Sequence, residues 1–273
     1  MKHKLVRKTV RDFSEAELGP IAHEIDRDAR FPWQVIEKMR VLNYFGLQIP
    51  RKYGGAEADS ISYAITIEEL SKVCASIGLC VTVHNSVGAQ PIKSFGTEKQ
   101  KECFLPPMAS GERIGAFCLT EANAGSDASG VETNAVEVED GYIINGTKIF
   151  VTNGGICGYA LIFATMTTGA GKPFTNVFIV EKEMAGFSVG EIEDLCGMRA
   201  NPVSSLFLED CKVPFDNCLG QPGSGIKIAL TALDSGRIGI AAQALGIAQG
   251  AFEAAIKYSK ERQQFKKPIS SFQ

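Results

Sequence analysis

The sequence predicts an α+β protein with three regions: an N-terminal helical domain at 1–113, a middle antiparallel β-barrel domain at 114–219, and the first, incomplete part of a C-terminal helical bundle at 220–273. Two observations support this. Apolar residues recur at helical spacing in the outer regions, and short alternating runs fill the middle one. Strong turn dipeptides separate the short runs of the middle region.

The first region contains several helix starts. Apolar residues fall on one helical face between 18 and 25, and Pro32 precedes a second amphipathic segment that reaches residue 45. Asp59 or Ser60 can cap a third helix, and Thr97-Glu98-Lys99-Gln100 has the form of a capping box. These signals predict a layer of helices.

The middle region alternates apolar and polar residues in short runs such as VETNAVEV and TKIFV. Asp140-Gly141 and Asn145-Gly146 are hairpin turn signals between them. Several short strands in about a hundred residues predict a barrel or a sandwich.

Helical spacing returns after Gly225 and continues for roughly 35 residues without proline. Gly236, Gly239, Gly246 and Gly250 interrupt this segment, and each glycine costs a helix about 0.5–1 kcal/mol, which tight packing against neighbours explains. One helix cannot bury its own apolar face, so we expect the rest of a bundle in another chain or beyond residue 273. A large exposed apolar patch should make the isolated chain sticky.

Composition excludes several classes of function. A formal charge of −3 and a pI near 5.8 argue against nucleic acid or an anionic membrane as partner. No apolar run is long enough for a transmembrane helix, and the N-terminus lacks the apolar centre of a signal peptide, so we expect a cytoplasmic protein. Eight cysteines without a CxxC pair favour reduced, mostly buried thiols over disulfides or zinc. Three scattered histidines make a metal cluster improbable.

The segment CLTEANAGSDASG at 118–130 contains almost only small residues after its Thr-Glu pair. It is either a polar turn or a cradle whose backbone amides approach a phosphate or an electron-rich ring. The segment GQPGSG at 220–225 lacks both the GxGxxG spacing and a preceding strand, so it is not a dinucleotide fingerprint, although an anion at the following helix start stays open.

The motifs FCLTE…GSD, KIFVTNGG, LDSGRIGIAAQALGIAQGAF and ERQQF, in this order, resemble the acyl-CoA dehydrogenase family, and most closely its bacterial short-chain, butyryl-CoA type. The resemblance covers essentially the whole chain. It implies FAD as cofactor, a short-chain acyl-CoA as substrate, and α,β-dehydrogenation to the trans-2-enoyl-CoA. It also implies electron-transfer flavoprotein as electron acceptor and a homotetramer.

The resemblance also implies site residues. Those expected against the flavin or its pyrophosphate are Phe117, Leu119, Thr120, Gly125, Ser126, Phe150, Val151 and Thr152. Ser126, Asp234 and Arg237 are expected to contact the acyl-CoA. Asp127 is expected to fix the loop instead. From the residues alone, Phe150 could be an ordinary inward strand residue, and Asp234 with Arg237 a surface ion pair.

The final segment is expected to reach FAD bound to a neighbouring subunit. Its matching residues are Arg262, Gln264, Phe265 and Gln273, whereas Lys266 stands where relatives usually have glycine. The family's catalytic glutamate lies either well beyond residue 273 or at the position of Gly236. The sequence therefore predicts no catalytic base, and little or no dehydrogenase activity, for these 273 residues.

Three alternatives remain open at this stage. One is an acyl-CoA oxidase or flavin monooxygenase of the same fold. Another is a non-catalytic protein or gene fragment that binds FAD and acyl-CoA or assists assembly. The third is an α+β ligand-binding protein without flavin. The length and branching of the acyl chain are not specified by the motifs.

Overall fold

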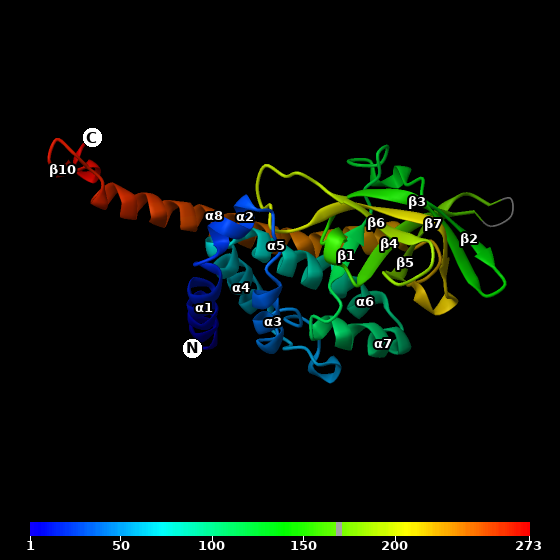
Figure 1. The fold of residues 1–273 in the computed structure, drawn as a ribbon. Helices are drawn as coiled ribbons and strands as arrows, with labels where there is room; N and C mark the ends of the chain where they lie inside the picture. Colours follow the sequence, from blue (N-terminus) through cyan, green and yellow to red (C-terminus); the bar gives the residue numbers. More distant parts are fainter. Residues whose placement is uncertain (168–170) are drawn as a thin grey trace.

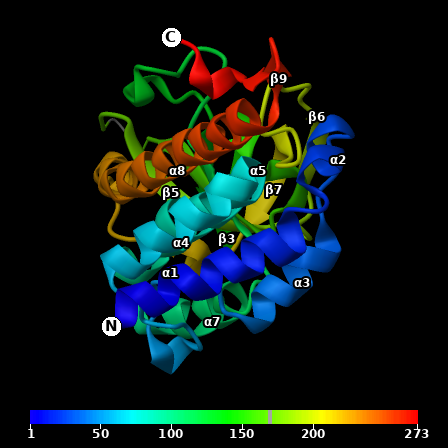
Figure 2. The same ribbon diagram turned by 90° about the vertical axis from the view of Figure 1, so that its left-hand side faces the viewer.

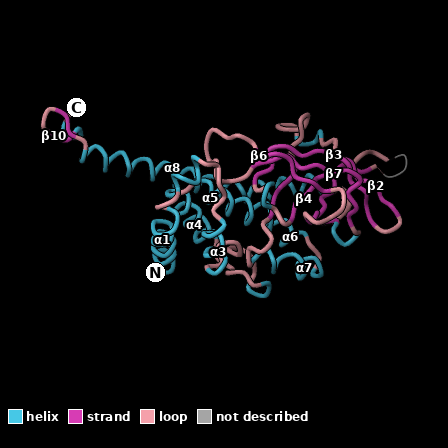
Figure 3. Tube along the Cα trace, viewed as in Figure 1, coloured by secondary structure: helices cyan, strands magenta, loops and turns pink. Residues whose placement is uncertain are grey.

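The structure is a computed structural model and describes residues 1–167 and 171–273. Most helices of the first region lie toward one end of the molecule and the strands toward the other, while the last two helices of that region lie below the strands, as Figures 1 and 3 show. The first region contains α1 (Lys2–Phe13), α2 (Ala22–Arg27), α3 (Trp33–Val41), α4 (Ser60–Val73), α5 (Ala75–Val83), α6 (Gln90–Phe95) and α7 (Glu98–Ala109), with π-helical turns η1 (Ser14–Leu18) and η3 (His84–Ala89).

Two predicted helix starts are confirmed. The Asp59 carboxylate accepts a hydrogen bond from the Ser62 amide at 2.7 Å, and Thr97 with Gln100 forms the reciprocal capping box at the start of α7. The apolar face between 18 and 25 is buried but not continuous, because the chain turns between η1 and α2 at Gly19-Pro20.

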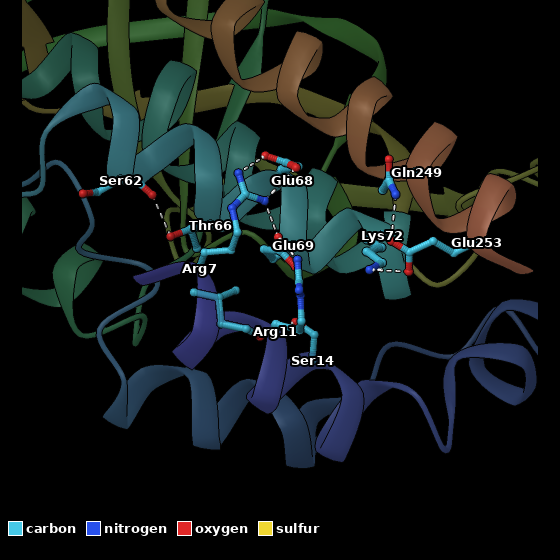
Figure 4. A network of polar contacts seen from close by, with 11 residues as sticks. Arg7, Arg11, Ser14, Ser62, Thr66, Glu68, Glu69, Lys72, Gln249 and Glu253 are labelled. Atoms are coloured by element: carbon cyan, nitrogen blue, oxygen red, sulfur yellow. Dashed lines mark hydrogen bonds and ion pairs between the residues drawn. The ribbon is translucent and has the colours of Figure 1, made fainter. Parts of the chain in front are cut away.

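Helix α4 lies between α1 and α8 (Gly225–Glu261), and the three run side by side in Figure 2. Figure 4 shows the polar network that joins them. Arg7 donates to both oxygens of Glu68, at 2.7 and 2.8 Å, and Arg7 and Arg11 both donate to the buried Glu69. On the other side of α4, an ion pair of 2.6 Å joins Lys72 to Glu253 of α8.

The middle region forms one eight-stranded sheet among the described residues, in the order β6-β7-β3-β2-β4-β5-β8, with β1 also paired to β4. Its strands are β1 (Gly115–Cys118), β2 (Asn134–Val138), β3 (Gly141–Thr152), β4 (Tyr159–Met166), β5 (Phe174–Glu181), β6 (Phe187–Ile192), β7 (Val203–Val213) and β8 (Cys218–Leu219). Antiparallel pairing prevails as predicted, but β1 and β2 both pair with β4 in parallel. The sheet is therefore mixed and not purely antiparallel.

Both faces of the central strands are buried. Leu161, Phe163 and Ile179 belong to the core cluster that includes residues of α6 and α7, whereas Ile162 and Phe178 belong to the cluster on the opposite face. Neighbouring residues of one strand thus enter different cores, as the period of two requires. The helical region covers one face of the sheet.

Helix α8 is 37 residues long, which corresponds to about 55 Å. A Cβ added at Gly239 would clash with the Tyr63 hydroxyl, and one at Gly246 or Gly250 with carbonyl oxygens of α4. The prediction that these glycines permit close packing is confirmed. Large apolar side chains remain exposed elsewhere on α8, at Leu230, Ile238, Ile240, Leu245, Ile247, Phe252, Ile256 and Tyr258. No helix in the described ranges has the length and apolar character needed to cross a membrane.

Candidate functional site

A cavity of about 530 Å³ lies where α5, η3, β1 and α8 meet. Three positions singled out by the sequence analysis line it: Phe117, Gly236 and Arg237. The rest of the lining is mostly apolar, namely Thr82, Val83, Ser86, Val87, Leu233, Ile240, Ala241 and Ala244. Residues from all three regions of the sequence therefore converge on one apolar cavity with the exposed Arg237 at its rim.

Strand β1 leads from this cavity into the small-residue loop. The ring of Phe117 packs edge-on against Phe163, with centroids 4.8 Å apart. The Leu119 side chain is buried in the core, so only its backbone can face a ligand. The carbonyl of Thr120 accepts a hydrogen bond from the Ile149 amide at 3.0 Å. The start of the loop therefore lies beside β3.

Strand β3 is irregular where the KIFVTN motif runs. Its register with β7 shifts between Lys148 and Val151, and Phe150 has a φ of 53°. This bulge leaves the Phe150 side chain 62% exposed, while Val151 is buried and Thr152 half-buried. Phe150 is thus not an ordinary inward strand residue. Bulges that turn a side chain outward are frequent beside active sites.

Asn153, which the sequence analysis did not single out, holds the end of β3 in place. It is fully buried with a φ of 65°, and its side-chain amide donates to the carbonyls of Cys80 and Gly115, each at 3.2 Å. It also accepts from the side-chain amide of Asn201 at 2.8 Å. These bonds tie β3 to α5 and to β1, on which Phe117 lies.

The loop after Thr120 exposes Gly125 and Ser126. Within the described ranges, neither amide has a protein acceptor, and a Cβ added at Gly125 would meet no atom within 4 Å. The glycine is therefore not required by packing within the chain. Asp127 accepts a hydrogen bond from the Ser129 amide at 3.1 Å, in agreement with its expected role of fixing the loop.

Two buried charged side chains, Glu121 and Lys148, lie at the neck of this loop, which is the place where its two ends meet. The sequence analysis assigned no role to either. The Lys148 ammonium, which is 0% exposed, lies 2.6 Å from the Glu121 carboxylate. Glu121 also accepts from the amides of Glu132 and Thr133, at 2.7 and 3.1 Å. Burial raises the pKa of Glu121, but the bonds from Lys148 and Thr133 outweigh it, so the pKa lies below its usual value. The signal in the sequence that could have pointed to this pair is a lysine at position 148 within a predicted strand.

His84 of η3 is a further buried group beneath the cavity. Its Nδ1 accepts from the Gly115 amide at 2.9 Å, so Nε2 carries the proton and donates to the Met108 carbonyl at 3.1 Å. Burial lowers the pKa of His84 to about 4. The neutral imidazole joins α7 to the first residue of β1.

Asp234 and Arg237 lie three residues apart on α8 and pair with each other. Their side chains are 70% and 71% exposed. A pair this exposed contributes little to stability. Because Arg237 also lines the cavity, its guanidinium can bind an anionic group at the cavity mouth without any rearrangement of α8.

The predicted C-terminal site residues do not join this cavity. Arg262 follows the last residue of α8, and Gln264 and Phe265 belong to the hairpin of β9 (Gln263–Gln264) and β10 (Lys267–Pro268), with Gln273 after it. Figure 1 shows the hairpin at the far end of α8 from the β strands. Phe265 and Lys266 form its turn with φ values of 48° and 61°. Lysine here adopts a backbone conformation that glycine takes more readily.

Other parts of the surface offer weaker candidates. A hollow of about 720 Å³ between β2 and the end of β4 contains none of the predicted site residues. Among the residues that the structure describes, no group of three or more His, Cys, Asp or Glu side chains could hold a metal ion. Five of the eight cysteines are buried, as expected.

The residues present fit a bound flavin. A large planar ring needs an apolar wall, and Phe117 of β1 and the outward-turned Phe150 of β3 supply aromatic surface. A pyrophosphate needs amide donors and close backbone approach, and Gly125 and Ser126 have free amides facing open space.

Comparison with known proteins gives matches along the chain. Residues 1–112 match the acyl-CoA dehydrogenase N-terminal domain, 116–211 the middle domain, and 223–273 the C-terminal domain. The short-chain specific acyl-CoA dehydrogenase of Clostridium acetobutylicum is 47% identical over 272 residues, which are 100% of this chain and 72% of that protein.

Solved structures agree with this match. Butyryl-CoA dehydrogenase from Megasphaera elsdenii has a TM-score of 0.94 and 42% identity, covering 99% of this chain and 72% of that one. An acyl-CoA dehydrogenase complexed with FAD from Bacillus anthracis has a TM-score of 0.90 and 34% identity, covering 99% and 46%. The chain therefore belongs to the acyl-CoA dehydrogenase family of FAD-binding oxidoreductases.

Proposed function

We propose that the protein binds FAD and a short-chain acyl-CoA at the cavity between β1 and α8, for α,β-dehydrogenation to the trans-2-enoyl-CoA. The observation that carries this proposal is the convergence of Phe117, Gly236 and Arg237 on one apolar cavity, with the small-residue loop following Phe117 in the chain. The 47% identity to a short-chain specific dehydrogenase supports the substrate class. Electron-transfer flavoprotein as acceptor rests on the family resemblance.

Each part of the cavity suits one part of these ligands. The apolar lining excludes water around a short acyl chain, and the exposed Arg237 suits the phosphates or pantetheine of coenzyme A, with Asp234 accepting a hydrogen bond. The amides of Gly125 and Ser126 and the Thr120 hydroxyl would hold FAD, and Phe150 would cover the ring. Bound FAD supplies the hydride acceptor.

Removal of the α proton needs a carboxylate, and the cavity lining contains none among the described residues. Gly236 lies in the lining at the position where some relatives carry the base. The lining of this chain can therefore bind and orient a thioester but cannot deprotonate it. This favours, as a second candidate for these 273 residues, binding of FAD and acyl-CoA without catalysis.

For the C-terminal segment we propose contact with FAD of a neighbouring subunit in a homo-oligomer. Arg262 lies 18 residues beyond Ala244, the last cavity residue on the same continuous helix, which is about 27 Å along the axis. Arg262, Gln264, Phe265 and Gln273 thus cannot serve the cavity of their own chain. Lys266 strains the turn that would present Phe265.

Titration of the FAD-loaded protein with butyryl-CoA tests the substrate proposal. We expect saturable binding that weakens about tenfold in Arg237→Ala, because a charge-assisted contact is lost. Lys227→Ala is the matched control, since this exposed cation of α8 does not line the cavity and should change nothing.

Absence of butyryl-CoA binding, or equal effects of the two variants, would reject the substrate assignment. Rapid reaction of the reduced protein with oxygen would instead favour an oxidase or monooxygenase. Binding without turnover would support the non-catalytic candidate.

A further inference from the structure

The loop from Glu121 to Thr133 is closed at its neck by one side chain. Glu121 bonds Ala124 through its backbone in both directions, at 3.0 and 3.1 Å. Its carboxylate accepts from the amides of Glu132 and Thr133, 11 and 12 residues further along the chain. Glu121 therefore joins the outgoing and the returning limb of the loop where they meet, and the exposed Asn123 side chain adds a bond to the Glu132 carboxylate at 3.2 Å.

Lys148 fixes this neck to the sheet. Its ammonium group donates to the Glu121 carboxylate and to the Phe163 carbonyl, both at 2.6 Å, and to the Leu119 carbonyl at 3.4 Å. All three donors of a fully buried ammonium are thus used. Lys148 also lies two residues before the outward-turned Phe150. Lys148 therefore connects the loop to the part of β3 that contains the bulge.

We infer that the Glu121–Lys148 pair is a positioning device: it holds the backbone amides of Gly125 and Ser126 in a fixed position relative to the bulge at Phe150 in β3. This inference rests on the proposed function, in which that loop holds FAD. The pair itself touches neither ligand; it acts through the loop.

Energetics support positioning over stabilisation. A buried ion pair is often no more stabilising than a well-packed apolar pair of similar volume, because desolvation offsets the attraction between the charges. An apolar pair, however, cannot accept the Glu132 and Thr133 amides. The carboxylate thus contributes something that packing cannot replace: a fixed acceptor at the loop neck.

The double variant Glu121→Leu/Lys148→Met separates the two roles, because it leaves no unpaired buried charge. We expect it to fold with a lower thermal midpoint, because the buried Thr133 amide and the Leu119 and Phe163 carbonyls lose these bonds, so FAD binding is compared at a temperature at which both proteins are folded. Its dissociation constant for FAD should rise at least about tenfold, because the loop must be ordered on binding. Amides of residues 122–132 should exchange hydrogen faster in the absence of FAD.

Arg11→Met/Glu69→Leu is the matched control. It also removes a buried carboxylate and a cation, but those contacts lie within α1 and α4, so FAD affinity should not change. Glu121→Gln keeps the length of the side chain, but in either orientation its NH2 group faces a donor, either the Lys148 ammonium or the backbone amides, so it should weaken FAD binding in the same direction. Glu121→Gln provides the test of the inference if the double variant does not fold.

Unchanged FAD affinity and unchanged loop exchange in a folded variant would overturn the inference. If the wild type itself binds no FAD, the proposed function fails, yet the exchange measurement still decides the positioning role. Loop exchange that is equal in the wild type and the double variant would then reject it.

Discussion

At the scale of single residues, the groups that shape the site are buried polar side chains with every contact used. Lys148, Asn153 and His84 each join segments far apart in the sequence: β3 to the loop, β3 to α5 and β1, and η3 to α7 and β1. Low polarity around such groups makes each bond strong and each loss costly. They hold in place β1 and β3, the strands that carry Phe117 and Phe150.

His84 should make stability depend on pH. Its folded pKa of about 4 lies below the ordinary value of 6.5, so the unfolded chain binds the proton first as pH falls. The contribution of neutral His84 is therefore complete above pH 6.5 and is lost between 6.5 and 4, by about 3 kcal/mol. Thermal unfolding across this window should show a slope in the wild type that is absent in His84→Gln. Parallel curves for the two proteins would contradict the assignment.

The motifs in the sequence suggested candidate site residues. They did not indicate the buried polar side chains that hold the segments carrying those residues in place. FCLTE and KIFVTN pointed to Thr120, Phe150 and Thr152, because motifs record what stands in order along the chain. The Glu121–Lys148 pair depends on register across 27 residues and on a mixed sheet, which no local pattern contains. The φ values above zero at Phe150 and Lys266 were invisible for the same reason.

At the scale of elements, α8 is the organising helix, and its glycines set how closely α4 approaches. The spacing of apolar residues predicted its length, and caps predicted the starts of α4 and α7. The turn predicted at Asp140-Gly141 separates β2 from β3, but the turn predicted at Asn145-Gly146 is wrong: these residues lie inside β3, where its register with β7 shifts. Turn residues also did not indicate which strands pair. Long-range packing decides the parallel pairing of β1 and β2 with β4. The alternation of apolar and polar residues within one strand carries no information about its partner.

Gly246→Ala tests the close approach. Alanine gains helix propensity, but its Cβ would clash with the Glu68 carbonyl, a backbone atom that cannot move alone. We expect a net loss of about 1–3 kcal/mol in the free energy of unfolding by urea. Gly236→Ala is the control, because the nearest atom is the Val87 Cγ1 at 3.3 Å and the loss should be smaller. A Gly246→Ala protein as stable as the wild type would contradict this packing.

At the scale of the whole molecule, a helical layer and a mixed sheet together form a cavity that neither could form alone. The cavity brings an apolar wall and an exposed guanidinium together, but its described lining holds no carboxylate. The described lining therefore offers contacts for a ligand but no carboxylate to remove a proton from it.

Gly236→Glu should supply the missing carboxylate. With FAD, butyryl-CoA and an artificial electron acceptor, we expect negligible turnover by the 273-residue chain and at least about tenfold more by the variant, as is typical of a gained general base. Gly236→Gln has the same shape without basicity and should not gain activity. Robust turnover by the unsubstituted chain, or equal rates for Glu and Gln, would show that the base lies elsewhere.

The most direct measurement is a titration of the chain with FAD, in the wild type and in Gly125→Ala. The account predicts saturable binding of one FAD per chain by the wild type. It predicts about tenfold weaker binding by Gly125→Ala at an unchanged thermal midpoint, because the added Cβ meets no protein atom within 4 Å but intrudes where the ligand approaches. A wild-type protein that shows no saturable FAD binding would contradict the account.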